Sequence, residues 1–207
     1  MPPERVVLIR HGQSQWNAAG RWQGHGGPGL TARGHRQAAL TAAFLATHET
    51  DVQLVASSDL ARATETAAPA AEAVGVPVQT DRRLREIDVG WWSGLTTAEI
   101  ARRDPQGHAA LRDGGDPPRG GVETERQLRH RVGSALAELA ASCGGGTLLV
   151  FSHGGPVRAV VGDTLGLSIA QQRTLAGPGN CSSTLLTFEA GRPRLRSYNE
   201  TAHLRDA

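Results

Sequence analysis

The sequence predicts a three-layer α/β/α fold, with helices on both faces of a doubly wound, mostly parallel sheet. Short apolar runs at residues 5–10, 53–57 and 147–152 are typical of buried central strands, and segments with helical spacing separate them. Alternation of strands and helices along a chain is characteristic of parallel sheets. Two segments of alternating polarity, 184–188 and 194–198, predict an antiparallel hairpin at the edge, so the expected sheet is mixed.

Helices are expected between the strands because apolar residues recur there every three or four positions. Thr31 can cap the first helix, a Ser or Asp can cap the second, and Thr96 with Glu99 forms a capping box for a short helix. Three glycines at 144–146 are expected to end the helix before the last parallel strand. The expected helices are 31–47, 59–74, 123–141 and 155–166, and a further short strand lies near 76–78.

The composition limits the classes of function that are open to this chain. Its 207 residues, 39% of them hydrophobic, are enough for one well-buried domain, so a single domain over residues 1–207 is expected. All 22 basic residues are arginine, which excludes a lysine-dependent phosphate loop and Schiff-base chemistry. The arginines are interleaved with acids and the net charge is only +2, so nucleic-acid binding is not indicated.

The two cysteines, Cys143 and Cys181, predict neither a disulfide framework nor a zinc site. They lie far apart in the sequence and lack the spacing of metal ligands, so no metal or other cofactor is expected. The chain has no apolar stretch of about 18 residues and no charged N-terminal region followed by a long apolar core. We therefore expect a cytoplasmic protein without a membrane span.

The stretch between Arg103 and Gly121 is rich in glycine and proline. Such a composition predicts a long surface loop without regular structure. In a compact domain a loop of this length is either a flexible connector or a functional lid, and both interpretations stay open.

Two histidines directly follow two of the predicted central strands. Arg10-His11-Gly12 stands after the first apolar run, and His153-Gly154 stands after the last one. The carboxyl ends of parallel strands meet at one edge of a sheet, where open α/β folds bind their ligands. Both histidines are therefore expected at one point, and Arg62, in the first turn of the second helix, is expected near it.

Glu86 lies between the apolar residues Leu84 and Ile87 of an alternating segment and is the candidate proton donor. A carboxylic acid at a phosphate site can protonate the leaving oxygen and later deprotonate the attacking water. Asp88 is the rival, because on an extended segment it points to the same face as Glu86. The other interpretation of Glu86 is a surface salt bridge with Arg83 or Arg85.

Together these motifs resemble the histidine phosphatase superfamily, also called the phosphoglycerate-mutase-like family. The family signature corresponds to Arg-His-Gly-Gln-Ser-Gln-Trp-Asn at residues 10–17, and the similarity covers nearly the whole chain. The resemblance implies a phosphoglycerate-mutase-like fold and a nucleophilic His11 that becomes phosphohistidine. Further matching segments are 20–24, 30–34, 152–155 and 198–204.

The resemblance also implies the other roles in the site. His11 must be neutral on its attacking nitrogen, with the other nitrogen donating to a backbone carbonyl. Arg10 and Arg62 are expected to clamp the phosphate, and His153, preferably protonated, to donate a further hydrogen bond. Glu86 is expected to act as acid and then as base. The residues expected to contact the substrate are Gly12, Asn17, Trp22, Gln23, Gly24 and Gly154.

The function expected from the sequence is a metal-independent phosphomonoesterase that hydrolyses a small phosphorylated metabolite through phosphohistidine. The expected partner is this small phosphate ester, with no nucleic acid and no membrane, and a homodimer is left open. One alternative is a cofactor-dependent phosphoglycerate mutase, but such relatives are longer and have Glu-Arg-His-Tyr-Gly where this chain has Glu-Ile-Asp-Val-Gly at residues 86–90. A second alternative is a non-catalytic phosphate-binding domain on the same fold, against which intact His11 and Glu86 argue.

Overall fold

The computed structural model describes residues 3–49, 51–189 and 191–205. Its centre is a six-stranded sheet with the strand order β3-β2-β4-β1-β5-β6. The first four strands of this order are mutually parallel, β5 is antiparallel to β1, and β6 is antiparallel to β5, so the predicted mixed sheet is confirmed. The strands are β1 (Arg5–Arg10), β2 (Val52–Ser57), β3 (Val78–Thr80), β4 (Thr147–Ser152), β5 (Ser183–Glu189) and β6 (Arg192–Glu200).

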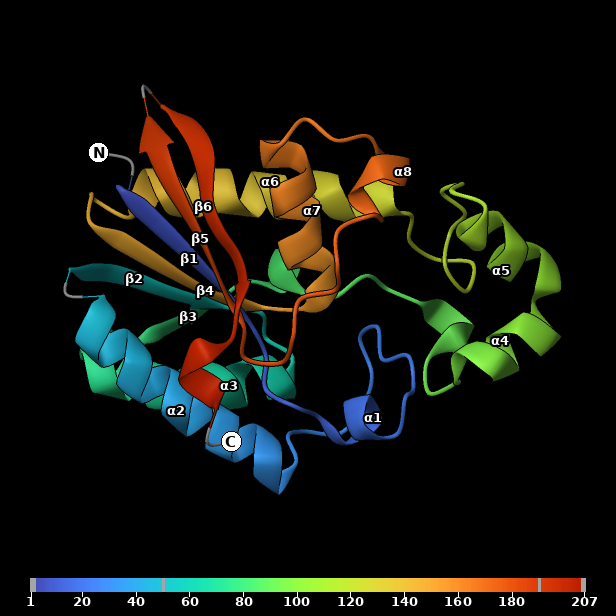
Figure 1. The fold of residues 1–207 in the computed structure, drawn as a ribbon, viewed down its shortest axis with the longest axis horizontal. Coiled ribbons are helices and arrows are strands. Elements are labelled where there is room, and N and C mark those ends of the chain that lie inside the picture. The colour runs from blue at the N-terminus through green and yellow to red at the C-terminus, as the bar shows by residue number, and fades with distance from the viewer. Residues whose placement is uncertain (1–2, 50, 190, 206–207) are drawn as a thin grey trace.

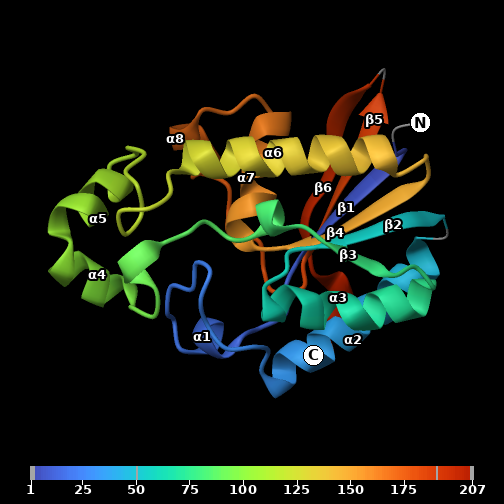
Figure 2. The ribbon, with the colours of Figure 1, turned by 180° about the vertical axis from the view of Figure 1, so that it is seen from behind.

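Helices cover both faces of the sheet because both faces of its central strands are apolar. Val6 and Leu8 of β1 face α6 (Glu125–Ser142) and α7 (Gly154–Thr164), with which they share one core cluster. The intervening Val7 and Ile9 pack in a second cluster with α2 (Ala32–His48) and α3 (Ala61–Val74). This alternation follows from the two-residue period of a strand. Figures 1 and 2 show the three layers that result, as predicted.

The boundaries of the elements follow their local chemistry. Thr31 caps α2 by accepting from the backbone N–H of Gly34 at 3.0 Å, as predicted. The predicted side-chain cap of α3 is wrong, because this helix begins after Leu60 without one. β3 begins at Val78, two residues later than expected, since Pro77 before it has no N–H to donate to a sheet.

The expectation of a loop without regular structure over 104–121 is wrong for its first half. Pro105–Arg112 form helix α5, because the Asp104 side chain accepts from the N–H of Gly107 at 2.8 Å and Pro105 occupies the first helical position. A proline there removes only an N–H that has no partner within a helix. Together with α4 (Thr97–Arg103), which begins with the predicted capping box at Thr96, α5 lies at one end of the molecule, away from the sheet (Figure 1).

Three consecutive glycines follow helix α6. Gly144, Gly145 and Gly146 all have positive φ angles, of 75°, 110° and 55°, so they end α6 as predicted.

Ala190, within the connection between β5 and β6, lies outside the described residues. No helix in the described ranges combines the length and the apolar character needed to cross a membrane. The short elements are α1 (Gln15–Ala18), α8 (Ile169–Gln172), and the 3-10 turns Arg82–Leu84, Gly90–Trp92 and Ala202–Leu204.

Candidate active site

A cavity of about 360 Å³ opens at the carboxyl edge of the parallel strands. His11 and His153 directly follow β1 and β4, which pair in register up to Arg10 and Ser152. Their rings therefore meet as predicted, with 5.1 Å between the ring centroids, and both side chains are buried. His11 lines the cavity, whereas His153 lies beside it and is not among the lining residues.

His11 is held in one tautomer by the backbone. Its Nδ1 lies 2.7 Å from the carbonyl oxygen of Gly12, and a carbonyl can only accept, so Nδ1 carries a proton and Nε2 keeps its lone pair. Burial lowers the pKa of His11 well below its usual value, and the positive charges of Arg10 and Arg62 lower it further. The imidazole is therefore neutral near pH 7 and has a nucleophilic nitrogen, as expected from the sequence.

His153 was expected to be protonated, but its surroundings in the structure favour the neutral form. Burial lowers its pKa well below the usual value, and the charges of Arg62 and Arg10 act in the same direction. Nε2 lies 2.8 Å from the hydroxyl of Ser58, while Nδ1 is buried without a partner among the described residues. Protonation of His153 therefore requires a nearby negative charge, such as that of a phosphate dianion.

Two arginines, the partly buried Arg10 and the buried Arg62, flank His11, and backbone carbonyls hold both. Arg10 Nη1 donates to Pro178 at 2.6 Å, and the two Nη atoms of Arg62 donate to Gly26 and Gly24 at 2.9 and 2.7 Å. Desolvation lowers the pKa of Arg62 to about 10, so it stays charged at neutral pH. The Nε of each arginine is buried without a partner in the described part of the chain, which leaves donors for the oxygens of an anion.

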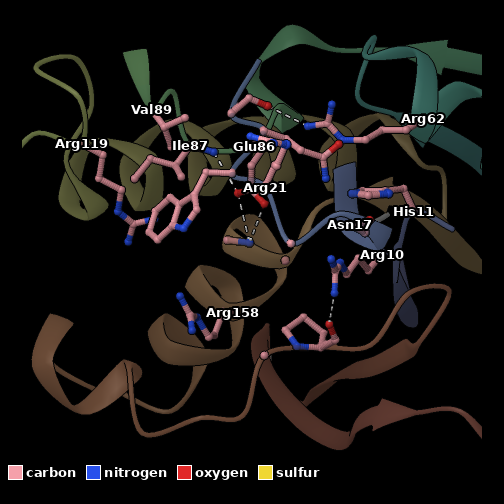
Figure 3. Close-up of a pocket in the computed structure, with 18 residues that line it drawn as sticks. Arg10, His11, Asn17, Arg21, Arg62, Glu86, Ile87, Val89, Arg119 and Arg158 are labelled. Atoms are coloured by element: carbon pink, nitrogen blue, oxygen red, sulfur yellow. Dashed lines mark hydrogen bonds between the residues drawn. The ribbon is translucent and has the colours of Figure 1, made fainter. Parts of the chain in front are cut away.

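Glu86 extends into the same cavity (Figure 3). Its carboxylate accepts from the backbone N–H of Gly155, in the first turn of α7, at 3.1 and 3.3 Å, and from that of Ile87 at 2.9 Å. The alternative of a surface salt bridge is wrong, because Arg85 pairs with Asp59 and Arg83 pairs with other carboxylates. Glu86 therefore faces His11 and the two arginines without an ion-pair partner of its own among the described residues.

Asp88 does not share the face of Glu86. It is not among the residues that line the cavity, and its carboxylate accepts from Gly90 N at 2.9 Å and lies 3.5 Å from His25 Nδ1. The reason is local, since residues 85–89 form neither a strand nor a helix and the two-residue alternation of a strand does not apply. Asp88 therefore faces His25 and not the cavity.

An ion pair between Arg131 and Glu123, which sequence reasoning missed, fixes the irregular segment that carries Glu86. Arg131 donates to the carbonyls of Arg83, Arg85 and Glu86 at 2.7–2.8 Å, and its Nε lies 2.6 Å from Glu123. Glu123 in turn accepts from the N–H of Asp88 at 2.8 Å. The backbone is thus held on both sides of Glu86. The sequence signal for this contact is Arg131 itself, a charged residue beside the apolar positions of the helix expected at 123–141.

Most of the expected substrate contacts line the cavity, but Gly12 does not. The N–H of Gly12 donates to Thr66 at 2.9 Å, and a Cβ there would lie 2.7 Å from the carbonyl oxygen of Gly34. Its small size therefore serves packing against the start of α2. Trp22, at the cavity wall, donates to Thr97 at 3.0 Å and lies under the guanidinium of Arg119. The expected residues that line the cavity are Asn17, Trp22, Gln23, Gly24 and Gly154.

Three further arginines of the cavity wall, Arg21, Arg119 and Arg158, were not expected from the sequence. Arg119 comes from the 104–121 segment, so this segment contributes directly to the site. In total five arginines but only one carboxylate, Glu86, stand among the described residues of the lining. No group of three or more His, Cys, Asp or Glu side chains in the described ranges is arranged to hold a metal ion. The cavity is thus built for an anion.

The chain matches the family model described as "Histidine phosphatase superfamily (branch 1)" over residues 6–201. It is 35% identical to glucosyl-3-phosphoglycerate phosphatase of Mycobacterium tuberculosis over 220 residues, covering 99% of this chain and 98% of that protein. It is 33% identical to phosphoserine phosphatase 1 of Hydrogenobacter thermophilus, covering 97% and 94%.

Solved structures agree with these relatives. The mycobacterial glucosyl-3-phosphoglycerate phosphatase in complex with VO3 superimposes with a TM-score of 0.87 at 34% identity, covering 96% of this chain and all of that one.

A bifunctional protein of Mycobacterium tuberculosis is 40% identical over 157 residues, but the match covers only 43% of that protein, against 75% of this chain. The chain thus spans less than half of that relative.

The two buried histidines predict a specific pH dependence of stability. Their pKa values are lowered in the folded state, so below about pH 6.5 the unfolded chain binds protons that the folded chain does not. The free energy of unfolding should therefore fall as the pH falls below about 6.5, by up to about 1.4 kcal/mol per pH unit for each histidine. Urea titrations between pH 7 and 5 measure this slope.

His11→Gln and His153→Gln should each make this slope shallower. The matched control is His35→Gln, since His35 is exposed and should leave the slope unchanged. If His11→Gln and His153→Gln kept the wild-type slope, the two rings would not be buried in the neutral form.

Proposed function

Since the chain belongs to branch 1 of the histidine phosphatase superfamily, we propose that it hydrolyses a small phosphate ester through a phosphohistidine on His11. The observation that carries this proposal is the state of His11, which is neutral, hydrogen-bonded to the Gly12 carbonyl and flanked by Arg10 and Arg62. Relatives named as phosphatases favour hydrolysis over phosphoglycerate mutase activity and over a non-catalytic domain.

In the first step His11 Nε2 attacks phosphorus as the ester P–O bond breaks. Arg10 and Arg62 bind the oxygens of the phosphoryl group, whose charge is best stabilised by donors that are already in place. The negative charge of the phosphate raises the pKa of His153, which then donates a further hydrogen bond. Asn17 and Gly154, at the cavity wall, complete the contacts to the phosphate.

Glu86 supplies the proton that the leaving alkoxide needs. In the second step its carboxylate takes a proton from water, the oxygen of this water bonds to phosphorus, and the P–N bond to His11 breaks. The step releases inorganic phosphate and returns His11 to the neutral form and Glu86 to the acid form. Because Gly155 and the Arg131–Glu123 pair fix Glu86, one carboxyl group serves both steps from the same position.

The arginines of the cavity supply the positive charge that many phosphatases obtain from divalent ions, so we propose that turnover needs no metal. Trp22, Gln23 and Gly24 form the wall against which the organic part of the ester would lie. Cys143 and Cys181 are buried thiols without a disulfide, which fits the reducing environment of the cytoplasm, the compartment we propose.

Removal of divalent ions should leave the activity intact. Excess EDTA is expected to change the rate of p-nitrophenyl phosphate hydrolysis by less than about twofold, because arginines stabilise the transition state. The released p-nitrophenol measures this rate. Loss of activity that magnesium or zinc restores would contradict metal-independent hydrolysis.

Replacing Glu86 should affect esters according to their leaving groups. Glu86→Gln is expected to lower kcat/KM for an alkyl phosphate about ten- to a thousandfold more than kcat/KM for p-nitrophenyl phosphate, whose leaving group needs no proton. Asp88→Asn is the matched control, because Asp88 faces His25 instead of the cavity. Leaving-group dependence in Asp88→Asn, with equal losses for both esters in Glu86→Gln, would show that Asp88 is the acid.

A further inference from the structure

Asn180 lies beside the site, and the proposed reaction leaves it without a role. It belongs to the connection between α8 and β5 and directly precedes Cys181, whose backbone N–H donates to the carbonyls of Arg10 and His11 at 3.0 and 3.3 Å. Asn180 Nδ2 donates to the carbonyl of His11 and to Oδ1 of Asn17, both at 3.0 Å. An amide nitrogen carries two hydrogens, so both are engaged. Asn180 therefore joins the backbone of the nucleophile to the side chain of Asn17.

The neighbours of Asn17 determine which end of its amide faces the cavity. Its Oδ1 accepts from the backbone N–H of Ser14 at 3.1 Å and from Asn180 at 3.0 Å. A backbone N–H can only donate, so the atom of Asn17 that faces Ser14 is the oxygen and not the nitrogen. The nitrogen of Asn180 is identified in the same way, because the His11 carbonyl can only accept. The N–H groups of Asn17 therefore point away from these donors.

The N–H groups of Asn17 are free to bind a ligand. Asn17 lines the same cavity as His11 and Arg10 (Figure 3). Within the described part of the chain, the hydrogen bonds of its side chain all end on Oδ1, and its Nδ2 is not among the buried polar atoms that lack a partner. Nδ2 is therefore accessible and can donate to an anion in the cavity. A flipped amide would instead direct an oxygen at the anion and lose both hydrogen bonds on the protein side.

Ser14 alone holds the amide of Asn17 less firmly than Ser14 and Asn180 together. The hydroxyl of Ser14 lies 3.1 Å from Asn17 Oδ1 and 2.8 Å from Gln23 Oε1, but its single hydrogen can serve only one of them at a time. Among the described residues, the lasting donors to Oδ1 are thus the Ser14 N–H and Asn180. Without Asn180 one of these two is lost, and the amide can turn away from the direction that an anion needs.

We propose that Asn180 is a positioning residue for phosphate binding, which holds the oxygen of Asn17 and so directs the N–H groups of Asn17 at the phosphoryl group. Donors that are already in place stabilise the charge of a phosphoryl group best. Because the same amide of Asn180 also holds the carbonyl of His11, it fixes Asn17 relative to the nucleophile. The inference rests on the proposed phosphatase function and adds a residue that acts on the phosphate through Asn17.

A double-mutant cycle between Asn180 and Asn17 tests this assignment. Asn180→Ala removes both donors and should lower kcat/KM for p-nitrophenyl phosphate about tenfold, with a similar loss of affinity for inorganic phosphate, as expected when a hydrogen bond to a charged group is impaired. Asn17→Ala should cost at least as much. In the Asn17→Ala background, Asn180→Ala should change both quantities by less than about twofold, because its effect passes through Asn17.

The matched control is Gln79→Ala, which removes an amide at an exposed position of the edge strand β3 and should leave kcat/KM and phosphate affinity unchanged. Calorimetric titration with inorganic phosphate measures the affinity. If Asn180→Ala cost about tenfold in both backgrounds, Asn180 would act on the fold and not through Asn17, and the assignment would be wrong. Unchanged kcat/KM in Asn180→Ala would also overturn it.

A measurement on the wild type decides if Asn180→Ala does not fold. The chain contains only three asparagines, so labelling with 15N-asparagine gives three side-chain amide signals in an NMR spectrum. Addition of inorganic phosphate should shift the side-chain amide protons of Asn17 downfield and slow their exchange with water, while those of Asn180 stay in place. A response of Asn180 without one of Asn17, or bound phosphate without any response of Asn17, would overturn the assignment.

These measurements separate the two proposals. If the wild type hydrolyses p-nitrophenyl phosphate but the losses from Asn180→Ala and Asn17→Ala multiply, only the positioning role is wrong. If the wild type hydrolyses no phosphate ester but inorganic phosphate shifts the Asn17 amide as expected, the phosphatase function is wrong and the positioning of Asn17 for an anion stands.

Discussion

The neutral imidazole of His11, buried between two arginines, is the constraint on which the rest of the site depends. An imidazole that is exposed to water titrates near pH 6.5 and is partly protonated under ordinary conditions. Here desolvation and the two guanidinium charges lower the pKa of His11, and the Gly12 carbonyl fixes the proton on Nδ1. The two arginines beside His11 therefore provide positive charge for the phosphate and also keep the nucleophile unprotonated.

Such an arrangement requires the fold to stabilise one partly buried and one buried cation before any anion is bound. It does so with backbone carbonyls, of Pro178 for Arg10 and of Gly24 and Gly26 for Arg62. Carbonyls reduce the cost of burying the cation. Unlike a carboxylate partner, they do not cancel its charge. Arg131 differs from these two arginines, because it fixes the Glu86 segment through three carbonyls while Glu123 balances its charge.

The parts of this structure that follow from local patterns could be predicted from the sequence. The apolar strands, the Thr31 cap and the placement of His11 and His153 at one sheet edge all depend on periodicity and on the geometry of parallel strands. The helix at 105–112 departs from the predicted loop because the Asp104-Pro105 start signal outweighs the abundance of glycine and proline around it. Local chemistry was decisive there, and composition was misleading.

Other features depend on burial and on contacts between distant segments, which no local pattern contains. The neutral state of His153 results from its complete burial beside two arginines from different elements. The role of Arg131 requires a segment about 45 residues earlier in the chain. That Arg158 Nε is buried without a hydrogen-bond partner among the described residues is likewise a property of the folded chain.

The central claim is that the phosphoryl group is transferred to His11 itself. It can be tested directly by mixing the enzyme with excess p-nitrophenyl phosphate, quenching rapidly in alkali, in which phosphohistidine survives, and digesting the protein for mass spectrometry. The account predicts one added phosphoryl group on the peptide that contains His11, none on the peptide that contains His153, and none in His11→Ala. A phosphoryl group on another residue, or steady turnover by His11→Ala, would contradict it.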